Sequence, residues 1–411
     1  MAISLNESIK LGFIDFLSRK VRSTITILGI VLGTMSIIVI MSIVSGMNEQ
    51  TMRWINETGG LKKISVYRDW GYQNPRNLST VFTMRELDFI RENIPEVEGF
   101  NAFIRDFSTV SASGNSTFSE VFGTLPDFEV IEEWNVAQGR FIKQFDYRES
   151  SDVIVIGTTI KNELFANRDP IGQYVTVKNK RLMVIGVMEH RQMQNAVGIN
   201  FGYGDNPLEY LNRRSIVPLS TMINKLRAVN GIESISIRAV DEEQPFILKP
   251  ILEDIVLNLR SGQPVFRIDT AIEDANEENQ TFAQIRIIFF FISLVSLLVG
   301  GIVIMNIMLA TIQERTREIG IRLACGARQI DILLQFLVQT VVVTFVGGVI
   351  GVIIAISILD FVGDFIKLAT KLEGSMVFVA LLVSVVVGLF FGIYPAVKAS
   401  KLDPVKALRY E

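Results

Sequence analysis

The chain has 411 residues, a net charge of −3, 49% hydrophobic residues and 20% charged residues. This composition is too apolar for a typical soluble protein and too charged for a chain that lies in the membrane throughout. The single cysteine, Cys325, excludes an intrachain disulfide, and the single histidine, His190, argues against a zinc site or a histidine-based catalytic triad. No nucleophile or acid–base group is recognisable, so we expect a non-catalytic protein without a metal.

The first predicted elements are a short N-terminal helix and a membrane span. Residues 1–22 begin with Ser4 and Glu7 at capping-box spacing, and apolar residues follow on one helical face. An amphipathic helix in the cytoplasmic interface fits this pattern, and a cytoplasmic extension of the first span is the alternative. Charge-free runs long enough to cross a bilayer, roughly 20 residues, predict four transmembrane helices. They lie at 23–48, 287–313, 332–359 and 374–397.

A large domain, residues 49–286, separates the first two spans, and its strand-like and helix-like segments alternate. Two β-α-β-like units are predicted at about 50–114 and 218–285, and an inserted β-rich part at about 115–217. The predicted strands are 61–67, 99–111, 234–239 and 265–269 in the split part, and 153–156, 174–177 and 182–187 in the insert. The helices are 245–259 and one that begins at a Thr83–Glu86 capping box and ends near Asn93. We therefore expect a mixed α/β domain.

Residues 188–213 are rich in Asn, Gly and Met and are predicted to form an exposed loop. Two interpretations are open for it. It is either a contact loop for a partner or substrate, or a mobile connector between strands.

The distribution of basic residues predicts the membrane topology. Segments 1–22, 314–331 and 398–411 each contain four Lys or Arg residues, whereas the short loop 360–373 has two lysines against three acidic residues. Because short basic loops stay in the cytoplasm, both termini are predicted to be cytoplasmic and residues 49–286 to lie outside.

The four predicted spans contain no Asp, Glu, Lys, Arg or His, which argues against an ion-coupled transporter. They instead carry small residues that allow helices to approach closely, together with one polar residue that could bond between helices. These predicted packing residues are Gly29, Gly33, Gly300, Gly301, Asn306, Gly347, Gly351, Gly388 and Gly392.

Two long motifs resemble the MacB/FtsX-like permeases of ATP-binding-cassette transporters, and the MacB branch most closely. They are 292-ISLVSLLVGGIVIMNIMLATIQERTREIGIRLACGARQIDILLQFLVQ-339 and 388-GLFFGIYPAVKASKLDPVKALRYE-411. The resemblance implies a four-span permease of a bacterial inner membrane, with an extracytoplasmic domain made of a split, porter-like part and an inserted part. It further implies a dimer, of identical or paralogous chains, that works with two copies of an ATPase by mechanotransmission in the efflux of drugs, peptides or other cargo.

The resemblance also assigns the cytoplasmic segment 314–331 as the coupling helix that contacts the ATPase. The residues expected to make this contact are Glu314, Arg315, Arg317, Glu318, Gly320, Arg322, Gly326 and Arg328. No G-x-x-x-x-G-K-[ST] motif occurs in the sequence, so ATP and Mg are expected to bind a separate partner ATPase rather than this chain.

Other partners and functions stay open at this point. Membrane lipids and an extracytoplasmic adaptor protein are further candidate partners, and nucleic acid is not expected. The alternative functions are extraction of lipoproteins or other lipid-linked cargo, and a scaffold that regulates cell-wall hydrolases.

Overall fold

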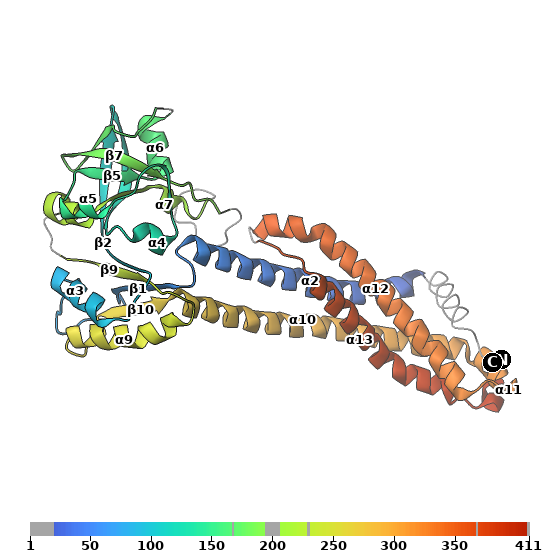
Figure 1. The fold of residues 1–411 in the computed structure, drawn as a ribbon. Helices are drawn as coiled ribbons and strands as arrows, with labels where there is room; N and C mark the ends of the chain where they lie inside the picture. Colours follow the sequence, from blue (N-terminus) through green and yellow to red (C-terminus); the bar gives the residue numbers. More distant parts are fainter. Residues whose placement is uncertain (1–19, 167, 194–205, 228–230, 367–368, 409–411) are drawn as a thin grey trace. The chain divides into compact units, whose positions relative to one another are not determined.

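The structure is a computed structural model that describes residues 20–166, 168–193, 206–227, 231–366 and 369–408. The chain divides into two compact units (Figure 1). We call residues 1–48 and 281–411 the helical unit and residues 49–280 the sheet unit. The helix predicted within residues 1–22 lies almost entirely outside the described residues.

The helical unit is built from helices α2 (Lys20–Glu57), α10 (Ala271–Glu314), α12 (Gln329–Ile366) and α13 (Gly374–Ser400). Within the described ranges, these four helices are long and apolar enough to cross a membrane. The helical conformation continues past the predicted spans, because hydropathy registers only the charge-free part of a helix. As a result, α2 and α10 contribute residues to both units.

Two short helices complete the helical unit. Helix α11 (Thr316–Ala324) lies between α10 and α12 in sequence, and α14 (Pro404–Leu408) follows α13. The predicted coupling segment 314–331 is thus only partly a separate helix. Gly326, at φ +93°, lies in the turn that follows α11, where the left-handed backbone suits a residue without a Cβ atom.

The split part of the sheet unit confirms the two predicted β-α-β units. The first is β1 (Lys63–Arg68), α3 (Met84–Asn93) and β2 (Gly99–Ala112), and the second is β9 (Ser234–Arg238), α9 (Gln244–Leu259) and β10 (Phe266–Thr270). The predicted capping box is present at the start of α3. The Thr83 hydroxyl accepts a hydrogen bond from Glu86 N, and the Glu86 carboxylate accepts one from Thr83 N at 2.8 Å.

The inserted part is rich in strands, as predicted. Its strands are β3 (Asn115–Thr124), β4 (Val136–Gly139), β5 (Val153–Ile156), β6 (Tyr174–Val177), β7 (Lys180–Met188) and β8 (Arg214–Pro218). Short helices connect them: α4 (Phe128–Glu132), α5 (Gln144–Arg148), α6 (Thr158–Phe165), α7 (Glu209–Asn212), α8 (Leu219–Thr221) and the π-helix η1 (Met222–Leu226).

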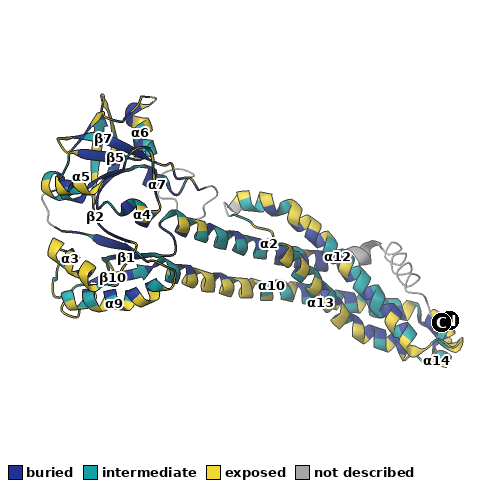
Figure 2. Ribbon diagram, viewed as in Figure 1, coloured by how far each residue is buried: buried dark blue, intermediate teal, exposed yellow. Residues whose placement is uncertain are grey.

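The two parts share one sheet rather than forming separate ones. The strand order is β10-β1-β9-β2-β3-β8-β5-β7-β4, and β6 pairs with β2 and β7. Strand β2 makes the connection, since its first residues pair with β9 and its later residues pair with β3 and β6. Helices α3 and α9 pack apolar residues against the β1–β9–β10 end of the sheet and keep exposed residues on their outer sides (Figure 2).

The prediction of an exposed loop at 188–213 is wrong for most of the residues that the structure describes there. Met188, Arg191, Met193 and Leu208 are buried, and residues 209–212 form α7. Met188, Met193 and Leu208 pack with the aromatic core of the inserted part, because they are apolar members of an otherwise polar segment. Residues 194–205 lie outside the described residues, and the choice between contact loop and connector is not tested for them.

Candidate functional site

Helix α11 is held against two other helices of its unit. A Cβ atom on Gly320 would lie only 2.6 Å from the Ala407 Cβ atom of α14, so the absence of a side chain lets the two helices touch. Arg322 donates a 3.0 Å hydrogen bond to Gln335 Oε1 of α12. The buried Ile319 adds an apolar contact to the core of the unit. These contacts fix the orientation of α11 relative to α14 and the first turns of α12.

The opposite face of α11 is exposed and carries both charge and apolar surface. Arg317 is exposed and makes no ion pair with any described residue. Ile321, one helical turn later, is 48% exposed. A free guanidinium beside an exposed isoleucine is typical of a protein–protein contact surface, in which an apolar centre has a charged rim.

The remaining residues of the predicted coupling segment are either paired within α11 or lie outside this helix. Glu318 is occupied within the helix, because it pairs with Arg322 at 2.5 Å and lies 4.0 Å from Arg315. Glu314 is the last residue of α10, and Arg328, which is exposed, precedes α12. The structure therefore separates the eight residues into an inward set and an outward set. That any of them contacts an ATPase stays a prediction.

The predicted packing glycines lie where helices approach each other most closely. A Cβ atom on Gly29 of α2 would lie 2.8 Å from the Cα atom of Gly300 of α10, and one on Gly33 would meet Leu297. Gly301 faces the ring of Phe391 of α13. In each case the space that a side chain would need is filled by the neighbouring helix.

The other two glycine pairs each meet a β-branched residue. Gly388 and Gly392 of α13 face Thr344 and Thr340 of α12, and Gly347 and Gly351 of α12 face Ile30 and Thr34 of α2. The hydroxyls of these buried threonines bond to backbone carbonyls of their own helices, so they bring no unpaired polar group into the contact. Asn306 differs: it is exposed and bonds to no described residue, so the chain itself gives it no packing role.

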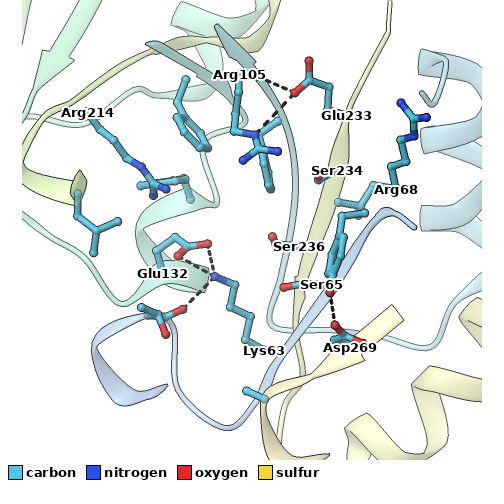
Figure 3. Close-up of a pocket in the computed structure, with 18 of the residues that line it drawn as sticks. Lys63, Ser65, Arg68, Arg105, Glu132, Arg214, Glu233, Ser234, Ser236 and Asp269 are labelled. Carbon is cyan, nitrogen blue, oxygen red and sulfur yellow. Dashed lines mark hydrogen bonds and ion pairs between the residues drawn. The ribbon is translucent and has the colours of Figure 1, made fainter. Parts of the chain in front are cut away.

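The sheet unit contains a cavity of about 660 Å³ that the sequence did not predict (Figure 3). Its floor is the face of the sheet that α3 and α9 leave uncovered. Across four strands, one row of paired residues is Asp269, Ser65, Ser236 and Asn101, and the next is Arg267, Tyr67, Ser234 and Phe103. The alternating residues between these rows, such as Val66 and Ile235, are fully buried on the helix-covered face.

The walls of the cavity are aromatic and charged. Phe122 and Phe128 come from the inserted part, Phe103 comes from β2, and Trp54 comes from the end of α2. Arg214 packs over the rings of Phe122 at 4.3 Å and Tyr210 at 5.2 Å and pairs with Glu120 at 3.0 Å.

Most charges that line the cavity are paired. Lys63 lies 2.7 Å from Glu132, and Arg227 lies 2.5 Å from Glu233. Tyr67 donates a hydrogen bond to Asp269, and burial together with this bond raises the pKa of Tyr67 to about 12.

A second cluster ties α2 to the inserted part. The Arg191 guanidinium, almost fully buried, donates to the backbone carbonyls of Glu132 and Glu133 at 3.0 and 2.6 Å and lies 3.3 Å from Glu57 of α2. Arg238 reaches the Glu133 carboxylate and the carbonyl of Gly59. Burial lowers the pKa of Arg191, although Glu57 and the acidic end of α4 favour the charged form. No group of His, Cys, Asp and Glu suited to holding a metal occurs among the residues with described positions.

Comparisons with known proteins cover both units. Residues 23–273 match the MacB-like periplasmic core domain, and residues 290–404 match the FtsX-like permease C-terminal domain. The pyoverdine export ATP-binding/permease protein PvdT of Pseudomonas syringae pv. tomato is 33% identical over 95% of this chain and 58% of its own length. The macrolide export ATP-binding/permease protein MacB of Aggregatibacter actinomycetemcomitans is 28% identical over 81% of this chain and 50% of its own.

The chain thus spans little more than half the length of these relatives. Among solved structures, the periplasmic region of MacB from Actinobacillus actinomycetemcomitans aligns with 57% of this chain and 97% of its own, at 17% identity and a TM-score of 0.45.

Proposed function

The chain belongs to the family of MacB-like and FtsX-like permeases of ABC transporters, and from this we propose that α11 couples it to a separate ATPase subunit. In this proposal, ATP hydrolysis by the partner moves the helical unit, and the movement reaches the sheet unit through the chain. In the same proposal, ATP and Mg bind the ATPase subunit.

The observation that carries the proposal is the division of α11 into two faces. Gly320 and Arg322 anchor the inward face, so a force applied to α11 acts on α12 and α14 as well. Arg317 and Ile321 lie on the outward face. The Arg317 guanidinium has no ion-pair partner in the described chain. An anchored helix with an exposed contact face is what a mechanical coupling element requires.

Mechanotransmission is favoured over a transport route between the spans. The predicted spans contain no ionisable residue, and their glycines bring the helices into close contact instead of leaving an open path. Helices α2 and α10 each continue into the sheet unit, which gives two covalent connections along which movement can pass. The cargo is therefore expected to be handled outside the membrane.

The names of the relatives favour export as the cellular role. The pyoverdine and macrolide export proteins combine ATP-binding and permease functions in their names. We extend export to this chain as a class, with cargo such as drugs or peptides left unspecified. The setting is a bacterial inner membrane with both termini in the cytoplasm, and the assembly contains two permease chains and two ATPase subunits, with an extracytoplasmic adaptor as a further component.

The test is affinity purification of the tagged chain from its native membrane, followed by mass spectrometry of the bound proteins. The Arg317→Glu variant reverses the one α11 charge that has no ion-pair partner in the described chain. We expect a P-loop ATPase with the wild-type chain and at least about a tenfold loss with the variant, since like charges facing each other cost several kcal/mol. Glu318 is unsuitable for this test, because its substitution would also break the pair with Arg322.

The matched control is Arg148→Glu, which reverses an exposed charge of the sheet unit. It should leave ATPase recovery unchanged. If no P-loop ATPase is recovered with the wild-type chain even after mild cross-linking, or if both variants lose it equally, the coupling role of α11 is wrong.

A further inference from the structure

Two buried serines, whose hydroxyls have no hydrogen-bond partner in the described chain, lie on the floor of the sheet-unit cavity. Ser234 and Ser236 are 4% and 2% exposed, and their hydroxyls form no hydrogen bond with any described residue. Both residues line the cavity, and Figure 3 shows them beside Ser65 on neighbouring strands. A hydroxyl without a protein partner in a largely apolar cavity is costly, so these two groups indicate that a ligand or water supplies the missing bonds.

Local packing does not require serine at these places. On the face covered by helices, the same strands use Ile235 and Ile237, which are fully buried. On the cavity face, larger apolar side chains at positions 234 and 236 would occupy part of the space that these two residues line. Serine keeps the floor open and hydrogen-bonding.

The walls offer rings for stacking. Phe103 and Phe122 lie 5.3 Å apart between centroids, and Trp54 and Tyr210 are further lining residues. Aromatic side chains around a cavity of this size match the usual lining of a small-molecule site, which has a volume of about 300–1,000 Å³ and a few polar groups that orient the ligand. The ligand that fits this wall has a flat, apolar part.

The charges at the Ser234 end favour an acidic ligand. Arg105 and Arg227 share a single carboxylate, that of Glu233, at 3.7 and 2.5 Å. Arg68 packs over Trp70 at 4.2 Å and forms no ion pair with a described residue. Near the first residue of β9, three guanidinium groups therefore lie close to a single carboxylate. This arrangement leaves positive charge that an anion can neutralise.

Two further acidic lining residues are already paired with cations and do not offset this excess. Glu132 is paired with Lys63, and Asp269 is paired with Arg267 at 2.7 Å. Asp274 has no cation within ion-pair distance in the described chain. Burial and the neighbouring Asp269 raise the pKa of Asp274 above its ordinary value.

We propose that this cavity is a binding site for a small aromatic organic anion. The ring lies between the aromatic walls, the acid group faces Arg68 and Arg105, and the hydroxyls of Ser234 and Ser236 bond to polar atoms of the ligand. The site belongs to the sheet unit alone, and its occupation does not depend on an ATPase partner.

The test uses three probes of equal shape and different charge: 2-naphthoate, 2-naphthamide and 2-naphthylmethylammonium. Each is titrated calorimetrically into the full chain in lipid nanodiscs at pH 7.5, and empty nanodiscs of the same lipid are titrated in parallel. The site predicts one 2-naphthoate per chain, with the amide at least about tenfold weaker and the cation weaker still, since a tenfold change in affinity corresponds to 1.4 kcal/mol.

Substitutions locate the binding. Arg68→Gln should weaken 2-naphthoate about tenfold and leave the amide unchanged, because only the anion uses the guanidinium. The double variant Ser234→Ala/Ser236→Ala should weaken both probes by about fivefold, since each loses hydrogen bonds. Arg148→Gln, an exposed position outside the cavity, should change neither probe. The melting temperature of each variant is measured alongside to show that the sheet unit is folded.

Three results would overturn the proposal. The first is uptake of 2-naphthoate no greater than that of empty nanodiscs. The second is equal affinity for all three probes, which would indicate non-specific apolar binding. The third is an equal loss in folded Arg68→Gln and Arg148→Gln, which would place the anion elsewhere.

Discussion

The substitution Arg191→Met removes the charged centre of the contact between α2 and the inserted part. Arg191 is 7% exposed and donates to two carbonyls at the end of α4, and its guanidinium lies over the ring of Trp134 at 5.5 Å. Methionine preserves most of the volume but offers no donor. The two carbonyls would lose their donor, and Glu57 would lose its cation.

The cost follows from these contacts. A hydrogen bond from a charged group contributes about 1.5–3 kcal/mol, and two are lost. Removing the guanidinium also removes the cost of burying it, which offsets part of this loss. Glu57 is 45% exposed and can be hydrated, so its loss of a partner adds little. We expect a net destabilisation of about 2–4 kcal/mol, or roughly 5–15 °C in melting temperature for a unit of this size.

The assay is thermal unfolding of the full chain in lipid nanodiscs, followed by tryptophan fluorescence. Trp134 reports directly, because it is buried and its indole N–H bonds to Glu189 O at 2.7 Å. Arg53→Met is the matched control, since Arg53 is on α2, as is Glu57, but is 69% exposed and paired only with Glu49 in the described structure. Its effect should be within about 0.5 kcal/mol. If Arg191→Met lowers the melting temperature no more than the control, Arg191 does not hold α2 to the insert.

Three further predictions address stability, packing and topology. Burial opposes ionisation of Glu86, but its bonds to Arg260 and to the N-cap backbone outweigh this effect and lower its pKa. The stability that the Glu86 carboxylate contributes is therefore complete above its ordinary pKa of 4.5 and is lost as the pH falls through the lowered pKa. Glu86→Gln should therefore cost about 1–2 kcal/mol at pH 7 and almost nothing in strong acid, and a pH-independent difference in urea unfolding would contradict this. Gly300→Val should lower the thermal stability of the helical unit by about 1–3 kcal/mol, because its side chain would push α10 away from Gly29, and an unchanged melting temperature would show that the contact is loose. Cys325 is exposed and follows α11 in the chain. A membrane-impermeant maleimide should therefore label it only after the cells are opened, and labelling in intact cells would contradict the predicted topology.

Much of the fold could be predicted because its signals are local. The four spans follow from uninterrupted apolar runs, and the start of α3 follows from the spacing of Thr83 and Glu86. The strands of the insert were recognisable from β-branched residues and turns. The turn between β6 and β7 is one example, where Lys178 and Asn179 adopt positive φ of 48° and 69°.

The single continuous sheet could not be predicted, because it depends on pairing between distant strands. Strand β2 changes its pairing partner along its length, from β9 to β3. No local sequence pattern indicates where one strand pairs with both parts of the unit. The coupling segment 314–331 was predictable from the sequence, but its division into an inward and an outward face was not. The exposure of Arg317 and the pairing of Glu318 depend on how α11 rests on α12 and α14.

The cavity and the Arg191 cluster were missed for the same reason. One signal for the cavity was present: in Ser234–Ile235–Ser236–Ile237, the polar positions look like a solvent-facing strand face, yet these serines are buried. The alternation was informative, but it could not reveal that the inserted part covers that face. Arg191 was hidden in a polar segment that resembles a loop, and only its carbonyl partners on α4 account for its burial.

The central claim is that ATP hydrolysis by a partner changes the sheet unit through α11. Hydrogen exchange of the reconstituted permease–ATPase complex tests it most directly, without nucleotide and with ADP–vanadate trapped after ATP hydrolysis. Coupling through α11 predicts an ATP-dependent change in amide exchange within residues 49–280, which Arg317→Glu abolishes and Arg148→Glu preserves. Hydrolysis of ATP by the wild-type complex without any change in exchange in the sheet unit would contradict it.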